Sequence, residues 1–255
     1  MSTTTLTILL VGGTGSVGRH VASTAIAAGH RVRVLSRTGR KAADGSDVVI
    51  GDLTDPATLG PAVDGIDAVI FTHGTHGGEG GNRDVDYGGV RNVLTAIGSR
   101  PVRIALMTAI GVTVRYESYK AHEWKRRAER LVRASGHPYT IVRPGWFDYN
   151  DADEHHLQFL QGDTRRAGNS SDGPIARSQI ADVLVAALTS PAAAGKTFEL
   201  VAERGPAQPD LEPLFAALEP DIAFDGPRDV DNQPIVDEPA SVRQELDELT
   251  GVATA

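Results

Sequence analysis

The sequence predicts an α/β fold in which helices cover both faces of a doubly wound parallel sheet. Its 255 residues are 40% hydrophobic, which suits one large domain, or one large domain with a small lobe. Short apolar runs alternate with segments of helical periodicity through the first 147 residues, and the first run ends abruptly in glycines. Strands that alternate with helices in this way form parallel sheets with right-handed crossovers.

Six apolar segments are predicted as the strands of this sheet. They cover residues 8–11, 31–35, 48–50, 68–71, 103–110 and 139–142. The helices between them are predicted directly after the glycine turn, from Asp55-Pro56, over 84–98 and over 117–135. Val85, Val90, Val93, Leu94 and Ile97 recur at the spacing expected for the apolar face of the helix over 84–98.

The pattern changes after residue 147. A polar segment and a loop precede a predicted helix over 180–188 and a late strand over 197–201. Beyond Gly205 the chain is rich in proline and acid, and a short terminal helix is predicted over 241–249. We expect residues 1–147 to form the core. Residues 148–255 should add a small C-terminal lobe on the substrate side, with the late strand and the acidic tail packed on the same domain.

Composition limits the compartment and the partners. The chain has no cysteine, which excludes disulfides and thiolate chemistry. Its N-terminus is too polar for a signal peptide and no apolar run approaches the roughly 20 residues of a membrane span, so a cytoplasmic protein is expected. Residues 199–255 carry 14 Asp and Glu against three Arg, whereas residues 1–198 are mildly positive. This balance suits an anionic cofactor and disfavours nucleic acid. We expect a small-molecule substrate, no membrane partner, and a monomer or homodimer.

The glycine turn at residues 12–18 is the strongest motif in the chain. Gly13, Gly15 and Gly18 satisfy G-x-G-x-x-G between a strand and a helix, the context of the dinucleotide-binding, Rossmann-like fold. Such glycines let the backbone approach a pyrophosphate, and the following helix offers unpaired N–H groups to the anion. A glycine turn that binds nothing is the alternative. The predicted cofactor contacts are Gly12, Thr14, Gly15, Ser16, Val17 and Gly18.

The end of the second strand predicts which dinucleotide is bound. An acidic residue there would select NAD, but the sequence reads Ser36-Arg37. A guanidinium can hold a 2′-phosphate in bidentate fashion, so NADP is the predicted cofactor. The alternative is a solvated basic loop. After the third strand, Asp52 either accepts a hydrogen bond from the adenine amino group or shapes a turn.

The chain resembles the atypical short-chain dehydrogenase/reductases, especially the compact NAD(P)H-binding group near NmrA-like proteins and biliverdin-reductase-type flavin reductases. The resemblance covers residues 6–201 and rests on the glycine turn, Gly51-Asp52-Leu53, Lys125-x-x-Ala128-Glu129, and Tyr139-Thr140-Ile141-Val142-Arg143-Pro144-Gly145. It implies a cofactor lying on the glycine turn, the basic residue of strand two, the acid of strand three and the exit of strand four. The implied contacts are Ser36, Arg37, Asp52, Leu53, Thr72, His73 and Gly74, with Pro144, Gly145, Trp146 and Phe147 at the nicotinamide end.

The usual catalytic group of this family pairs a serine or threonine with a tyrosine four residues before a lysine. Thr108, at the end of strand five, matches the hydroxyl; a structural β-branched residue is the alternative. By family context the lysine is Lys125, but the position four before it is Ala121. Tyr116-x-x-x-Lys120 fits the bare spacing, but Lys120 lies about 140° around the helix from Lys125. We favour Lys125 as the cofactor contact and keep Tyr116 as a candidate proton donor.

The arginines and the histidines of the chain are also interpreted. The arginines of the basic helix are interpreted as a solvated face: Arg126, Arg127, Arg130 and Arg133. His73-x-x-His76 with Glu154, His155 and His156 has the donor types of a zinc site, but glycine-rich loops hold ligands poorly, and no metal site is predicted. His155 or His156 is interpreted as a residue of the substrate pocket.

These features predict an NADPH-dependent reductase that transfers hydride to a small carbonyl-, quinone- or flavin-like acceptor. The missing paired tyrosine weakens ordinary ketone reduction, in which an alkoxide must be protonated. The rival is a non-catalytic NADP(H)-sensing regulatory protein, as the NmrA-like resemblance implies. An epimerase or dehydratase would need tightly held NAD, which Arg37 disfavours.

Overall fold

The computed structural model describes residues 4–75, 78–114, 120–230 and 233–253. Eight strands form the central sheet in the order β3-β2-β1-β4-β5-β6-β10-β8. Their bounds are β1 Thr7–Val11, β2 Arg31–Ser36, β3 Asp47–Ile50, β4 Ala68–Phe71, β5 Arg103–Met107, β6 Tyr139–Pro144, β8 His156–Leu160 and β10 Lys196–Glu203. Seven of these strands run parallel and β8 pairs with β10 in the antiparallel sense. The predicted α/β class, a mostly parallel sheet between helices, is confirmed.

The strand order reverses between β1 and β4. The chain runs outward from β1 through β2 to β3, and then crosses back to β4 on the other side of β1. At such a switch point the two connecting segments leave in opposite directions, so a crevice opens at the carboxyl ends of the strands. The glycine turn after β1 and the glycine-rich exit of β4 both lie at this edge.

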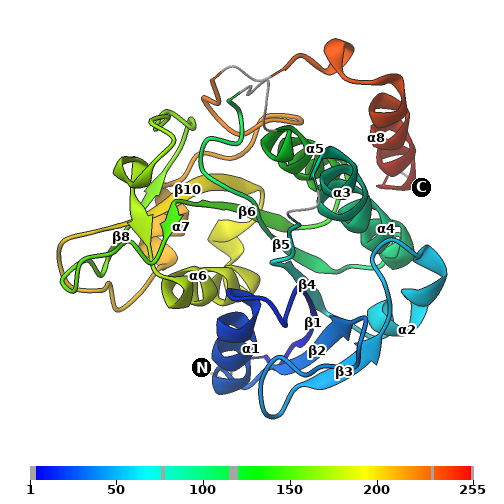
Figure 1. The fold of residues 1–255 in the computed structure, drawn as a ribbon, viewed down its shortest axis with the longest axis horizontal. Coiled ribbons are helices and arrows are strands. Elements are labelled where there is room, and N and C mark those ends of the chain that lie inside the picture. The colour runs from blue at the N-terminus through cyan, green and yellow to red at the C-terminus, as the bar shows by residue number, and fades with distance from the viewer. Residues whose placement is uncertain (1–3, 76–77, 115–119, 231–232, 254–255) are drawn as a thin grey trace.

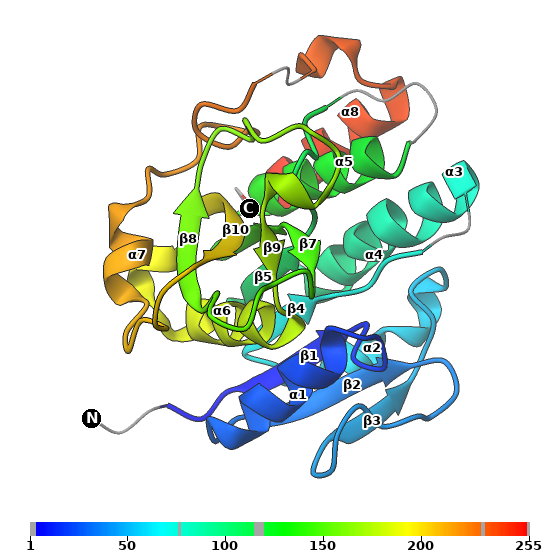
Figure 2. The same ribbon diagram turned by 60° about the vertical axis from the view of Figure 1, so that its left-hand side comes forward.

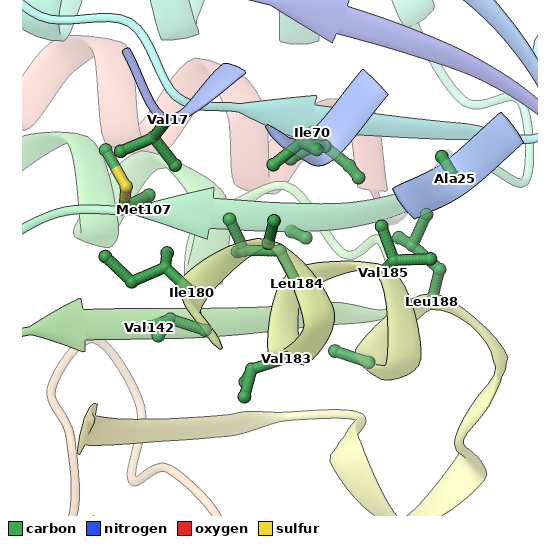
Figure 3. Close-up of a cluster of buried hydrophobic side chains, with 14 of the residues drawn as sticks. Val17, Ala25, Ile70, Met107, Val142, Ile180, Val183, Leu184, Val185 and Leu188 are labelled. Carbon is green, nitrogen blue, oxygen red and sulfur yellow. The ribbon is translucent and has the colours of Figure 1, made fainter. Parts of the chain in front are cut away.

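Helices cover both faces of the sheet (Figure 1). One face carries α1 (Gly18–Ala27) and α6 (Arg177–Thr189), and Figure 3 shows buried side chains of the core on this face, among them Val17, Ile70 and Leu184. The other face carries α2 (Gly60–Val63), α4 (Gly88–Ile97) and α5 (Ala121–Ala134). Successive residues of β1 point to opposite faces, so Leu9 joins one core and Leu10 the other.

The helix predicted over 84–98 differs from the expected one in its first turns. After the short α3 (Gly78–Gly81), residues Asn82–Tyr87 form a π-helix, and α4 begins only at Gly88. A π turn contains more residues than an α turn, so the face shifts. As a result Asp86 and Tyr87 are buried while Val85 is only half-buried. The apolar face predicted from Val90 onward is buried as expected.

The part of the chain after β6 adds to this sheet on its β6 side. A two-stranded pair, β7 (Trp146–Phe147) with β9 (Pro174–Ile175), stands apart from the main sheet (Figure 2). Helix α7 (Glu212–Ala217) precedes a long segment that leads to α8 (Ala240–Ala253), which packs on α5. The predicted terminal helix is confirmed, with Val242, Leu246 and Leu249 buried. Among the described helices, none combines the length and the apolar character that crossing a membrane requires.

Candidate functional site

The glycine turn and the exit of β4 are in direct contact. Gly12 has a φ of +87°, and a Cβ added there would lie 2.5 Å from the backbone N of His73. A Cβ on Gly18 would lie 2.2 Å from the carbonyl oxygen of Gly12, so this glycine is required for the packing of α1 on the turn. Gly15 and Ser16 are exposed at the tip of the turn, between buried Val17 and half-buried Thr14. The turn is therefore tight at its base and open at its tip.

The start of α1 fits an anionic ligand. The residue preceding the helix, Val17, makes no side-chain capping hydrogen bond. The first N–H groups of a helix have no partner within the helix and carry a partial positive charge, so they suit a phosphate group. The exposed tip at Gly15 leaves space for such a group beside them.

The residues predicted to contact the adenosine half lie at the ends of β2 and β3. Arg37 is exposed, and within the described part of the chain it makes no hydrogen bond or ion pair. Buried Ser36 instead shapes the loop, its hydroxyl accepting from the Arg40 N–H at 3.0 Å. Asp52 accepts hydrogen bonds from the backbone and side chain of Thr54, which, with the charge of Arg37, lower its pKa. A cation and a carboxylate thus flank this end of the crevice.

Lys125 reaches from α5 to the exit of β4. Its Nζ donates to Asp86 Oδ1 at 3.0 Å, and the lysine side chain is 19% exposed whereas the carboxylate is 1% exposed. A Cβ added at Gly74 would lie 3.5 Å from Nζ and 3.4 Å from Asp86 Oδ1. The neighbours of Lys125 on its helix face are buried, namely Ala121, Ala128 and Val132. The glycine at position 74 therefore leaves the ammonium accessible from the crevice.

His73 lies between the glycine turn and this ion pair. Its Nε2 is 3.0 Å from the Val85 carbonyl oxygen, so Nε2 carries the proton and Nδ1 is the acceptor. Burial, together with the nearby charge of Lys125, lowers the pKa of His73 to about 4, so the imidazole is neutral at pH 7. Nδ1 is buried and has no hydrogen-bond partner within the described residues. A ligand hydroxyl would satisfy this acceptor.

Leu53 and Thr72 complete the walls around His73. A Cβ added at Gly89 would lie 3.2 Å from Leu53 and 3.5 Å from His73 Nε2, so the exits of β3 and β4 approach each other there. The Thr72 hydroxyl donates to the Val11 carbonyl oxygen at 3.2 Å and is buried. This hydrogen bond links the end of β4 to the end of β1, directly before the glycine turn.

Thr108 is placed differently from an open catalytic hydroxyl. Its Oγ1 donates to Glu129 Oε1 at 2.7 Å, and both residues are buried. Arg143 holds the same carboxylate through Nε at 3.0 Å and through a second nitrogen at 2.7 Å. Burial opposes the charge of Glu129, but the guanidinium groups of Arg143 and Arg133 outweigh it and lower its pKa. The Thr108 hydroxyl is therefore committed to a buried ionised network.

The interpretation of the α5 arginines as a solvated face is wrong. All four are buried against the acidic C-terminal segment, and their exposed fractions are 3% for Arg126, 6% for Arg127, 0% for Arg130 and 9% for Arg133. Glu238 pairs with Arg126 at 2.9 Å and with Arg127 and Arg130 at 2.7 Å each. Asp225 pairs with Arg130, and Asp221 with Arg133, at 2.8 Å. We call this set of four arginines and three acids the arginine face.

The turn after β6 lies at the same edge of the sheet. Pro144 ends the strand, and a Cβ on Gly145 would lie 2.2 Å from the Gly173 carbonyl oxygen. Trp146 is 36% exposed and Phe147 is half-buried. Their role as nicotinamide contacts stays a prediction.

Tyr116 and His76 lie outside the described residues. Lys120, the other member of the alternative pair, lies one residue before α5 and pairs with Glu123 at 3.0 Å. His155 donates its backbone N–H to the Gly205 carbonyl oxygen, and His156 begins β8. Within the described ranges, no three His, Asp or Glu side chains gather in a way that would hold a metal ion.

Sequence reasoning missed Asp86 and Asn82. The Asn82 side-chain amide donates to the second oxygen of Asp86 at 2.8 Å, and both residues are buried. The available signal was the i, i+4 spacing of two polar residues at the start of an otherwise apolar helix face. The π turn hid it, because α-helical spacing assigns Val85 rather than Asp86 to that face.

Comparisons with known proteins identify the family of this chain. A sequence model described as NAD(P)H-binding matches residues 12–191. Photosystem II assembly factor Ycf39 of Synechocystis is 28% identical over 204 residues, which cover 77% of this chain and 63% of that protein. Sanguinarine reductase of Eschscholzia californica is 28% identical over 227 residues, covering 70% of this chain and 82% of that enzyme. The chain spans between 44% and 63% of the length of three Ycf39 proteins that it matches.

A solved structure shares the fold over nearly the whole chain. It is a short-chain dehydrogenase/reductase superfamily protein from Agrobacterium tumefaciens with bound NAD, with a TM-score of 0.61, 22% identity and 97% coverage of both chains. The family match covers more than half of the present chain, and it includes the glycine turn, the exit of β4 and Lys125. The chain therefore belongs to the NAD(P)H-binding family that this model describes.

Proposed function

We propose that the protein is an NADPH-dependent reductase that transfers hydride to a small carbonyl-, quinone- or flavin-like acceptor. The observation that carries this proposal is the ammonium of Lys125. It is held by Asp86 at 3.0 Å beside Gly74, at the edge where the glycine turn meets the exit of β4. The reductase names among the relatives, including sanguinarine reductase, support the class of reaction. We infer a cytoplasmic location from the composition of the chain.

The residues at the crevice fit a nicotinamide dinucleotide. The open tip of the glycine turn and the start of α1 would hold the pyrophosphate, and exposed Arg37 would hold the 2′-phosphate of NADP. The Lys125 ammonium and the unpartnered Nδ1 of His73 offer a donor and an acceptor for ribose hydroxyls. When bound, the nicotinamide supplies the hydride.

Asp86 has a positioning role in this proposal. Its carboxylate accepts from the lysine ammonium at 3.0 Å and orients it beside Gly74, while the Asn82 amide donates to the second carboxylate oxygen. This pair replaces the tyrosine–lysine pair of the usual site, because Ala121 stands four residues before Lys125. A quinone or flavin that accepts a hydride takes its proton from water, so the missing tyrosine matters less for such acceptors.

A non-catalytic NADP(H) sensor is the second candidate. It is favoured by Ala121, by the Thr108 hydroxyl being occupied on Glu129, and by the assembly-factor names among the relatives. Such a protein binds the oxidised and reduced cofactors with unequal affinity and consumes neither.

Turnover and binding together distinguish the two candidates. NADPH consumption is measured against a panel of carbonyls, quinones and flavins, with calorimetric titration of NADPH and NADP⁺ alongside. Oxidation of NADPH by at least one acceptor, at a rate proportional to protein concentration, is the result expected of a reductase. Binding without oxidation by any acceptor gives the sensor the lead, and absence of binding contradicts both candidates.

A further inference from the structure

The turn after β6 presents two aromatic side chains to solvent. Of the large apolar side chains that are exposed in the described part of the chain, two are aromatic, Trp146 at 36% and Tyr149 at 62%. These two touch each other, with ring centroids 6.2 Å apart and planes at 86°. Single exposed apolar residues are common on protein surfaces, but a contacting indole and phenol form a surface with a specific geometry.

The backbone that carries this pair is rigid and locally strained. Asp148, between the two rings, has a φ of +59°, a conformation that costs a non-glycine residue about 1–2 kcal/mol. Three contacts hold it there. Its N–H donates to the Ile175 carbonyl oxygen at 2.9 Å, its carboxylate accepts from the Arg177 N–H at 3.0 Å, and it pairs with the Arg177 guanidinium. Strain that the surroundings hold in place in this way is typical of ligand-binding sites.

The same contacts fix which rings face outward. Trp146 and Phe147 pair with β9, and the Trp146 N–H donates to the Gly173 carbonyl oxygen at 2.9 Å. Phe147 lies under the Arg177 guanidinium, 5.1 Å from its carbon, and is half-buried. Phe147 therefore contributes to the packing of the fold, whereas the rings of Trp146 and Tyr149 remain accessible to a ligand.

The aromatic pair lies at the edge of the sheet where the hydride would be delivered. It directly follows the carboxyl end of β6, which is three strands along from β1 in the order β1-β4-β5-β6. At about 4.8 Å per strand the two ends are roughly 14 Å apart. A ligand in an open α/β sheet binds outside these carboxyl ends, so a second ligand beside the dinucleotide would meet the pair.

We infer that Trp146 and Tyr149 form the acceptor-binding corner of this site, and that the acceptor is a planar conjugated ring of the quinone or flavin type. This inference rests on the proposed function and narrows its acceptor. Two rings at 86° let a flat π-system stack on one and meet the edge of the other, which a puckered saturated ring cannot do. The charge beside the corner is neutralised within the Asp148–Arg177 pair, so the corner selects for ring shape rather than for charge.

The experiment measures binding, which keeps it independent of turnover. The probes are menadione and decahydronaphthalene-1,4-dione, which share the fused-ring 1,4-dione framework but differ in planarity. Equilibrium dialysis with and without saturating NADP⁺ gives their dissociation constants. The chain has two tryptophans, so Trp124→Phe leaves Trp146 as the single fluorophore, and saturable quenching by menadione locates the bound ring.

We expect menadione to bind at least tenfold more tightly than the saturated dione. In dialysis without cofactor, Trp146→Leu should weaken menadione binding about tenfold and Tyr149→Ala several-fold, with the melting temperature unchanged. Tyr149→Ala should also leave the NADP⁺ affinity unchanged. Ile50→Ala removes an apolar side chain that is 69% exposed at the end of β3, and it should change nothing. Equal affinity for the two diones, or wild-type menadione affinity in Trp146→Leu, overturns the inference. Failure of the wild-type chain to bind NADP⁺ instead contradicts the proposed function, and the dialysis without cofactor still tests the corner.

Discussion

Helix α5 carries cations on two sides, which differ in burial and in the number of their carboxylate partners. On the arginine face, Arg126, Arg127, Arg130 and Arg133 are buried and each meets at least one carboxylate. On the crevice side, Lys125 has one carboxylate partner and keeps 19% of its side chain exposed, beside an unpartnered acceptor on His73. Cations that are buried and paired with carboxylates organise structure, whereas a partly open cation at a sheet edge is available to a ligand.

The arginine face also explains the acidic tail. Its acids lie at residues 221, 225 and 238, outside the region that matches the family. The network continues through Arg143, which pairs with Asp229 at 2.7 Å and with Glu129, the partner of Thr108. The C-terminal segment is therefore tied to the helix that carries Lys125 and to the end of β5.

The largest expected effect is on the arginine face. Glu238→Ala would leave three arginines without their shared carboxylate, and removing one partner of a buried ion pair costs about 3–5 kcal/mol. We expect the melting temperature to fall by roughly 10 °C, as measured by calorimetry or circular dichroism. Asp247→Ala removes the same charge from an exposed position on α8 and should shift it by about 1 °C at most. Equal shifts in the two variants would show that the tail does not depend on these pairs.

The next largest effect concerns an exposed cation at the crevice. Arg37→Ala removes an exposed cation that has no hydrogen-bond or ion-pair partner in the described part of the chain, so stability should be unchanged. A charge-assisted bidentate contact contributes roughly 1.5–3 kcal/mol, so wild type should prefer NADPH over NADH by about tenfold to a hundredfold. The variant should lose that preference. Equal affinities in wild type, or a preference kept in Arg37→Ala, would contradict NADP selection at this position.

The smallest effect concerns one acid at the end of the buried network. Burial raises the pKa of Glu199 to about 7, although Arg143 opposes the shift. Between about pH 4.5 and 7 the folded chain therefore keeps a proton that the unfolded chain has lost, and this residue's contribution to the free energy of unfolding falls as pH rises. The variant Glu199→Gln has no titratable group at this position, so it lacks this pH-dependent contribution. The stability of the variant relative to wild type should rise by about 1–3 kcal/mol from pH 5 to pH 8. A relative stability that is independent of pH would show that Glu199 does not titrate there.

The fold and the glycine turn could be predicted because their signals are local. Apolar runs of strand length and the spacing of Gly13, Gly15 and Gly18 lie within short windows of sequence. The burial of the α5 arginines could not be predicted in this way. Four arginines within eight residues are typical of a solvated helix face, and their acidic partners are about 90–110 residues further along the chain. The opposite charges of the basic helix and the tail were the one available signal.

The candidate site was predictable only in part. Lys125 was identified from the family resemblance, but its partner Asp86 was missed because the π turn shifts the helix face by one residue. The commitment of Thr108 to Glu129 depends on Arg143, which comes from a different strand. Such three-body arrangements leave no periodic pattern in the sequence.

The claim that Lys125 is kept open for the cofactor is tested most directly by calorimetric titration of NADPH. Lys125→Met is combined with Asp86→Asn so that no buried carboxylate is left unpaired, and Lys120→Met is the matched control, since Lys120 already pairs with Glu123. We predict that the double variant stays folded and binds NADPH about tenfold more weakly, a loss of about 1.4 kcal/mol, while Lys120→Met binds as wild type does. Wild-type affinity in the double variant would contradict the account, and a loss confined to Lys120→Met would move the site to the alternative pair.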